Sequence, residues 1–375
     1  MGSGRARIAL VAVLFILSAC GREGWRSAAP ATTQPPVAEA TVAPSPSATP
    51  TATPRPTGTV AVMPTAAPGA TPSRTFSPLS GCDASVAAFP TGLGGNPTSL
   101  ARGDDGATWF ANGNVVGHMT PSGEVHSFRL PKDVRSFSIA NGFDGEMWFT
   151  DQGTTAIGRI SPSGKVQMFP TPTREGNPIG IGGDANPFSI TKGPDGAMWF
   201  TESAADRIGR IDPQGSITEY KLPSYDRVHA NPQGIVLGPD DRLWFVQPLD
   251  ETVAAFDPKT KRFSEYDLPV KDAFPSDITS ALGVLFIADP NNGIIRMKPD
   301  GSATVASLPT PDQEVWQVGV SGNQAWYLET KRGTVGKISH DGKPYTVATI
   351  GKGRLGIEAH PSIGAGPDGT WFVQS

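Results

Sequence analysis

Apolar and polar residues alternate in short runs along most of this chain, and turn-forming residues separate the runs. The clearest example is 187–223, PFSITKGPDGAMWFTESAADRIGRIDPQGSITEYKLP, in which the runs are Phe188–Lys192, Met198–Glu202, Ile208–Ile211 and Ile217–Leu222. No sustained helical period is present, and 37 Pro and 44 Gly disfavour long helices. The pattern therefore predicts four short β-strands joined by turns.

The same unit recurs along the chain as a turn followed by an aromatic pair. The copies read RGDDGATWFAN at 102–112, GFDGEMWFTD at 142–151, GPDGAMWFTE at 193–202, GPDDRLWFVQ at 238–247 and GPDGTWFVQS at 366–375, with degenerate copies ALGVLFIA at 281–288 and SGNQAWYLE at 321–329. Their anchors are 39, 51, 45, 41, 41 and 45 residues apart, at Trp109, Trp148, Trp199, Trp244, Leu285, Trp326 and Trp371. Four antiparallel strands, repeated seven times, predict an all-β fold, a seven-bladed β-propeller.

The acidic turn of the repeat has two interpretations. Asp195 and Glu202 have oxygen side chains of the kind that a metal loop uses, but a hairpin needs Pro-Asp-Gly whether or not a metal is present. DPNNG at 289–293 also lacks the further carboxylates that a calcium loop requires. We therefore interpret these turns as structural, the Trp-Phe pairs as packing between blades, and the glycine of Ile-Gly-Arg as a site of close packing.

The two ends of the chain are expected to close the ring together. The last repeat ends at Ser375, directly after its second strand, which would leave open strand edges. Near the other end, SVAAFPTG at 85–92 matches the fourth-strand stretch VQMFPTP at 166–172. We expect residues 85–90 to form the outer strand of the seventh blade, with 74–80 as a candidate third strand.

The amino-terminal part divides the chain into three regions. Residues 1–19 combine Arg5 and Arg7 with a short apolar run, which is typical of a signal peptide. The ending Leu-Ser-Ala-Cys resembles a bacterial lipobox and implies acylation of Cys20; an ordinary secreted protein is the alternative. Residues 20–82 are rich in Pro, Thr and Ala and predict a disordered spacer, and 83–375 form the propeller. We thus expect an extracytoplasmic protein anchored to the bacterial membrane by lipid alone.

Cysteine count and charge narrow the possibilities further. If Cys20 carries lipid, Cys82 has no partner within the chain, so we expect no intramolecular disulfide. The formal net charge of −4, with scattered Lys and Arg, gives no basic stripe and argues against nucleic acid as a partner. We expect a monomer.

The repeat P-x-x-I-T-x-G-P-D-G-x-x-W-F-T-E, followed by I-G-R-I and E-x-x-L-P, resembles the virginiamycin B lyase (streptogramin lyase) family over about 84–375. The resemblance implies a seven-bladed propeller. It also implies a carbon-oxygen lyase that opens the ester of a cyclic depsipeptide antibiotic by elimination, with a histidine base and Mg²⁺. The blade consensus itself is architectural, so it is much less specific for activity than for fold.

The family's catalytic positions transfer poorly onto this chain. The blade-six histidine position holds Trp316, and the blade-seven histidine is displaced by one residue to His360. Gln374 replaces one of the glutamates that help to hold the metal, and Glu358 is displaced by one position from the other. A rearranged lyase site would use His360 as the base, with Glu358 and Glu329 as candidate Mg²⁺ ligands.

The channel mouth also has residues suited to binding. We expect a rim with three aromatic rings, an amide, a carboxylate and a histidine: Phe137, Phe188, Trp316, Gln233, Glu329 and His229. Two function classes follow: a lipid-anchored propeller that binds a small molecule, peptide or protein ligand, and a streptogramin-type lyase. Propeller mouths with mixed side chains and no ligand are the third possibility. A divalent cation in the channel would favour the lyase.

Overall fold

The computed structural model describes residues 97–347, except 121–123, 144, 174–184, 224–228, 307, 310–313, 322 and 340. Outside that range it describes only the backbone of short strands. Among the residues that are described, no helix is long and apolar enough to cross a membrane. The predicted all-β class is confirmed.

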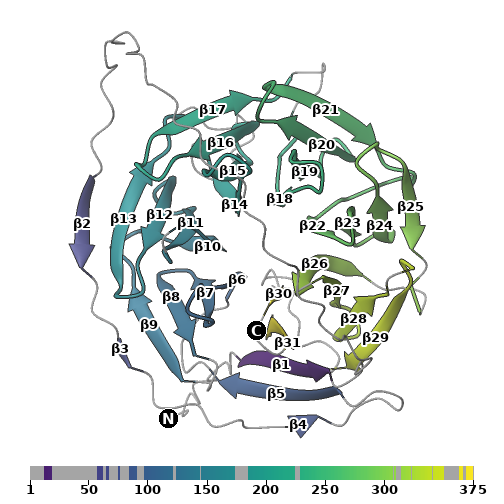
Figure 1. Cartoon of the computed structure of the whole chain (residues 1–375), viewed down its shortest axis with the longest axis horizontal. Coiled ribbons are helices and arrows are strands. Elements are labelled where there is room, and N and C mark those ends of the chain that lie inside the picture. Colours follow the sequence, from purple (N-terminus) through teal and green to yellow (C-terminus); the bar gives the residue numbers. More distant parts are fainter. Residues whose placement is uncertain are drawn as a thin grey trace, which may run out of the picture.

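Six four-stranded antiparallel blades surround a central channel, with the first strand of each innermost and the fourth outermost (Figure 1). Blade one consists of β6 (Ser99–Arg102), β7 (Thr108–Asn112), β8 (Val115–Met119) and β9 (Val125–Arg129). Blade two consists of β10 (Ser136–Asn141), β11 (Met147–Asp151), β12 (Ala156–Ile160) and β13 (Lys165–Pro170). Blade three consists of β14 (Pro187–Lys192), β15 (Met198–Glu202), β16 (Arg207–Ile211) and β17 (Ile217–Lys221). The next three are β18 (Ile235–Leu237), β19 (Leu243–Gln247), β20 (Thr252–Asp257) and β21 (Arg262–Asp267); β22 (Asp277–Ala281), β23 (Val284–Asp289), β24 (Gly293–Met297) and β25 (Ala303–Ala306); and β26 (Val315–Ser321), β27 (Gln324–Glu329), β28 (Thr334–Ile338) and β29 (Pro344–Thr349).

The sequence predicted seven blades, whereas the structure shows six. The seventh repeat, anchored at Trp371, lies outside the residues whose side chains are described. The backbone strands at the chain ends are ordered β30-β31-β1-β5-β4, with bounds Ile363–Ala365, Gly369–Gln374, Ala12–Ser18, Ala84–Pro90 and Thr75–Phe76. The apolar run β1, assigned by sequence to the signal peptide, pairs with both β31 and β5 and occupies the place predicted for 74–80. The predicted closure by the two chain ends is therefore not shown.

Two further backbone strands come from the segment predicted to be a spacer. β2 (Thr57–Ala61) pairs with the outer strand β13, and β3 (Thr65–Ala66) pairs with β9. These pairings do not test the division at residues 19 and 82, which stays a prediction.

The Trp-Phe pair builds the core of each blade. Trp148 stacks on Phe169 of the outer strand, with 5.7 Å between ring centroids, and Trp244 stacks on Tyr266 at 5.0 Å. The partner Phe149 lies over Gly158 of the Ile-Gly-Arg stretch, where a Cβ atom would come within 2.0 Å of the ring. The repeated glycine is therefore required by close packing, as predicted. Apolar clusters join neighbouring blades, so the same residues also hold blade to blade.

The acidic turn of the repeat is a structural device. In the third blade, the carboxylate of Asp195 accepts hydrogen bonds from Trp199 Nε1 at 2.9 Å and from Arg210 Nε at 2.6 Å. Asp289 of DPNNG similarly accepts backbone N–H groups from Asn291 and Asn292. Because these oxygens already bind donors of the protein, the structure favours the turn interpretation over a metal loop.

Candidate functional site

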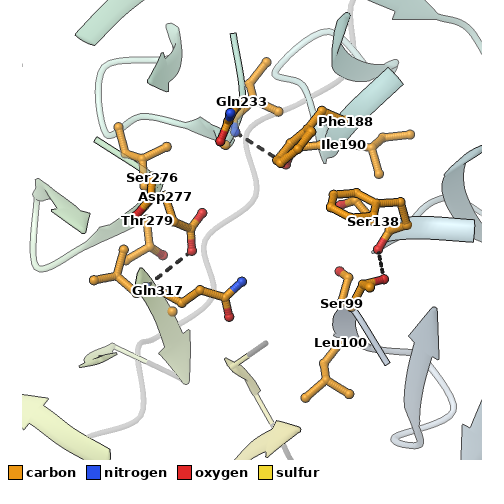
Figure 2. A pocket seen from close by; sticks show the side chains of 18 of the residues that line it. Ser99, Leu100, Ser138, Phe188, Ile190, Gln233, Ser276, Asp277, Thr279 and Gln317 are labelled. Atoms are coloured by element: carbon orange, nitrogen blue, oxygen red, sulfur yellow. Dashed lines mark hydrogen bonds between the residues drawn. The ribbon is translucent and has the colours of Figure 1, made fainter. Parts of the chain in front are cut away.

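The inner ends of the first strands enclose a cavity of about 300 Å³ in the central channel (Figure 2). Each described blade lines it with three to five consecutive residues, and the first two form an equivalent pair in every blade. The first of each pair are Thr98, Phe137, Phe188, Gln233, Ser276 and Trp316, and the second are Ser99, Ser138, Ser189, Gly234, Asp277 and Gln317. In blades two, three and six, the pairing of the first two strands shifts register at this point. Such a bulge lets successive side chains face the same side of a strand.

The second residue of each pair links one blade to the next. Ser99 Oγ accepts the backbone N–H of Ile139 at 3.0 Å, and Ser189 Oγ accepts that of Ile235 at 3.5 Å. Asp277 Oδ2 accepts the N–H of Val318 at 3.3 Å in the same way, so a carboxyl group replaces the hydroxyl in the fifth blade.

Asp277 has an unusual electrostatic setting. Burial raises the pKa of its carboxyl to about 7, although the backbone N–H groups of Ile278 and Val318 counteract the shift. Asp277 is half-buried and borders the cavity. Near neutral pH the group is therefore divided between its charged and neutral forms.

Two polar side-chain atoms at the start of the sixth blade have no hydrogen-bond partner. Trp316 Nε1 and Gln317 Oε1 are buried and form no hydrogen bond. Phe137 and Phe188 contact each other across neighbouring blades, with 4.7 Å between ring centroids. The cavity therefore combines an aromatic surface with amide side chains and a titratable acid.

Four of the six residues predicted for the rim line this cavity: Phe137, Phe188, Gln233 and Trp316. Glu329 lies elsewhere and is fully buried, where its carboxylate accepts the N–H of Arg332 and the hydroxyl of Thr334, both at 3.0 Å. His229 Nδ1 contacts Asp206 Oδ2 at 2.8 Å and ties the connection after blade three to a turn. The structure does not bring Glu329 and His229 to the cavity.

The remaining predicted site residues, His360, Glu358 and Cys20, lie outside the described residues. Within the described part of the chain, no group of three or more His, Cys, Asp or Glu side chains could hold a metal ion. Trp316 stands where the resemblance places a histidine, and the Glu329 carboxylate already binds backbone and hydroxyl donors. The described residues therefore do not fit a magnesium site, and no chemical step is assigned to that ion.

The sequence analysis interpreted Glu202 as part of a structural turn and not as a metal ligand, but its carboxyl group lies in an unusual environment. Both of its carboxyl oxygens are buried without a hydrogen-bond donor. Burial first, and then the adjacent Glu219, raise its pKa to about 9. In the next blade, Gln247 occupies the equivalent position and donates from Nε2 to Glu265 Oε1 at 3.0 Å. A protonated Glu202 can donate to Glu219 as the amide does.

Sequence reasoning missed Asp277 and Gln317 as channel residues because strict strand alternation admits one inward residue where the structure has two. A signal was nevertheless present. The position after the predicted rim residue is Ser or Gly in the first four blades and Asp in the fifth. An acid at a position that is otherwise Ser or Gly is not required by the packing of the repeat, so it indicates a residue specific to that blade.

Comparison with known proteins places this geometry in context. The profile of the virginiamycin B lyase family matches residues 81–186 and 182–374. A virginiamycin B lyase from Nocardia farcinica is 35% identical over 139 residues, which is 36% of this chain and 45% of that protein. The aligned part thus spans less than half the length of this relative.

Solved structures show the same architecture over a longer stretch. A streptogramin B lyase structure is 27% identical, with a TM-score of 0.64, and covers 75% of this chain and 93% of its own. A catalytically inactive variant of virginiamycin B lyase from Staphylococcus aureus with quinupristin is 25% identical, with a TM-score of 0.62 over 75% of this chain and 95% of its own. With the family profile matching well over half of its residues, the chain belongs to the virginiamycin B lyase family.

Proposed function

We propose that this protein is a lipid-anchored, extracytoplasmic propeller that binds a small-molecule, peptide or protein ligand in the mouth of its central channel. The observation that carries the proposal is the cavity of about 300 Å³ with aromatic rings, amide side chains and one carboxyl group on its wall.

The lipid anchor and the seventh blade belong to the same proposal. Acylation of Cys20 is supported by the lipobox-like sequence, and release of the Cys20→Ala variant into the medium would test it. Seven blades are supported by seven repeats in the sequence, and in the mature protein residues 85–90 would then pair within the last blade. An experimental structure of the mature chain with six blades would end that part of the proposal.

The binding test uses the full chain in detergent and a B-type streptogramin as the probe. Titration calorimetry should detect binding, and Trp316→Ala should weaken it about tenfold or more, because large aromatic side chains contribute strongly to binding. Leu249→Ala is the control, since this exposed side chain lies away from the cavity. Equal affinity for the parent and Trp316→Ala proteins would place binding outside the channel.

Lyase activity is the second candidate, favoured by membership of the family. In that reaction a base removes a C–H proton while the C–O bond breaks, so the ring opens to an acid and an alkene with no change of mass. The same incubation, with magnesium added, can be followed by mass spectrometry after a trapping or chromatographic step that separates open from cyclic forms. Rapid turnover that is lost in His360→Ala would replace the binding proposal with an enzyme.

A further inference from the structure

We propose that the channel recognises an ammonium group carried on an apolar or aromatic body, with the Asp277 carboxylate as the partner of the cation. This inference rests on the proposed function, because it specifies the chemistry of a ligand that the channel binds.

The charge of the channel points to a cation. Asp277 is the sole ionisable side chain among the described residues that line the cavity. No basic group within the described residues contributes to its titration; burial raises the pKa and backbone N–H groups lower it. An ammonium ion beside the carboxylate would restore the charged form, because an opposite charge favours ionisation. A neutral or anionic ligand would not stabilise the ionised form of the Asp277 carboxyl.

The arrangement of the walls points to an amphipathic ligand. In Figure 2, Asp277 and Gln317 face the cavity from one side, while Phe188 and Ile190 lie across it. Gln317, on the sixth blade, adds a neutral amide side chain to the same wall. The Phe137–Phe188 pair offers an apolar surface for the body of the ligand.

The neighbouring blades leave room for the carboxyl group and supply no competing charge. A Cβ atom at Gly234 would lie 2.8 Å from Asp277 Oδ1, so the carboxyl occupies space that a side chain would otherwise fill. The first strands on either side present Gly234 and Gln317, neither of which ionises. Oδ2 is held by the Val318 N–H, which orients the group without neutralising it.

A purely structural role for Asp277 is the competing explanation, and Glu202 shows what such a role looks like. Glu202 is fully buried and has another carboxyl group, Glu219, to receive its proton. Asp277 instead borders a cavity that a ligand can enter. The two explanations differ in the pH dependence of binding.

The experiment compares 2-phenylethylamine with 2-phenylethanol, a neutral molecule of similar shape, by calorimetry on the full chain at pH 6, 7 and 8. The amine stays protonated over this range, so any change reports on the protein. With a pKa of about 7, the ionised fraction of Asp277 rises about tenfold from pH 6 to pH 8, and affinity for the amine should rise by about the same factor. At pH 7, amine binding should release roughly half a proton.

Asp277→Asn should abolish both the pH dependence and the preference for the amine, while binding the alcohol as the parent does. Asp195→Asn is the matched control, because its carboxylate lies in a turn away from the cavity and should not affect either probe. If Asp277→Asn fails to fold, proton release by the parent protein decides the question by itself.

The outcomes separate this inference from the proposed function. Alcohol and amine binding equally, without pH dependence or proton release, would overturn the ammonium inference and leave channel binding intact. If the amine, the alcohol and the streptogramin all fail to bind at millimolar concentration, both the ammonium inference and the proposed function are overturned. Amine binding that persists unchanged in Asp277→Asn would place the cation elsewhere and also overturn the inference.

Discussion

Two carboxyl groups at the hairpin end of the blades, Asp195 and Asp240, differ in electrostatic character from two at the channel end, Glu202 and Asp277. At the hairpin end, burial acts to raise the pKa of Asp195, but hydrogen bonds from Trp199 and Arg210 and the charge of Arg210 bring it below its usual value. Asp240 behaves alike, with Trp244 and Arg242 as its donors. At the channel end, burial without comparable donors raises the pKa of Glu202 to about 9 and of Asp277 to about 7.

This difference separates carboxylates that stabilise the repeat from carboxyl groups that the repeat does not require. The hairpin carboxylates bond to residues of their own repeat, Trp199 and Arg210 in one blade, so they stabilise a unit that is copied around the ring. At the channel end the partners vary from blade to blade: Glu202 has none, whereas Glu329 accepts hydrogen bonds from Arg332 and Thr334. We therefore expect substitutions at the hairpin end to reduce stability, and substitutions at the channel end to change the response to pH and ligands.

The largest effect is expected from Trp199→Ala. This side chain is fully buried, stacks on Tyr220 at 5.6 Å and bonds to Asp195, so its removal leaves a cavity and an unpaired carboxylate. The free energy of unfolding should fall by about 3–5 kcal/mol, measured by denaturant titration. Trp316→Ala, at the channel, is the matched comparison and should cost clearly less. Similar losses for the two would contradict the division between the ends.

Glu202→Gln should stabilise the protein by roughly 2–3 kcal/mol at pH 7. The pKa of Glu202 is raised to about 9 in the folded state from 4.5. Stability is therefore fully present below about pH 4.5 and is lost as pH rises toward 9, and Gln removes that loss. Unfolding at pH 4 and pH 8 should show a gain that grows with pH. Gln247→Glu is the reverse control, and a stabilising result there would refute the interpretation.

Asp277→Asn should stabilise the protein at pH 8, because the pKa of this carboxyl is higher in the folded state than in the unfolded state. The pKa of Asp277 is about 7 in the folded state, whereas its ordinary value, taken for the unfolded chain, is 3.8. The parent protein therefore loses stability as the pH rises from about 4 to 7. The substitution should therefore stabilise at pH 8 and change little at pH 4, as seen in thermal unfolding. A loss of stability at both pH values would instead show that the carboxylate is needed for folding.

The blade could be predicted from sequence because its requirements are local. Trp148, Phe149 and Gly158 recur at fixed offsets, and each offset reflects a contact inside one sheet. The rim residues Phe188 and Trp316 were also found, because the start of a first strand always faces the channel.

What could not be predicted depends on departures from the regular strand. The register shift between Pro187 and Ile190 turns two consecutive residues toward the cavity, and alternation alone cannot anticipate it. Glu329 was expected at the rim because it follows the second strand, but its carboxylate folds back onto the turn at Arg332. The pKa of Asp277 depends on its burial and on a backbone N–H from the neighbouring blade, at Val318, which no local pattern encodes.

The hydrogen bonds that join successive blades inside the channel have a consequence for engineering. Ser99, Ser189 and Asp277 each accept one backbone N–H from the following blade, although one is an acid and two are alcohols. The inter-blade bond thus depends on an acceptor oxygen and not on charge. Carboxyl groups could therefore replace these serines while the hydrogen bonds between blades are kept. The ligand selectivity of the channel could in this way be changed without redesign of the scaffold.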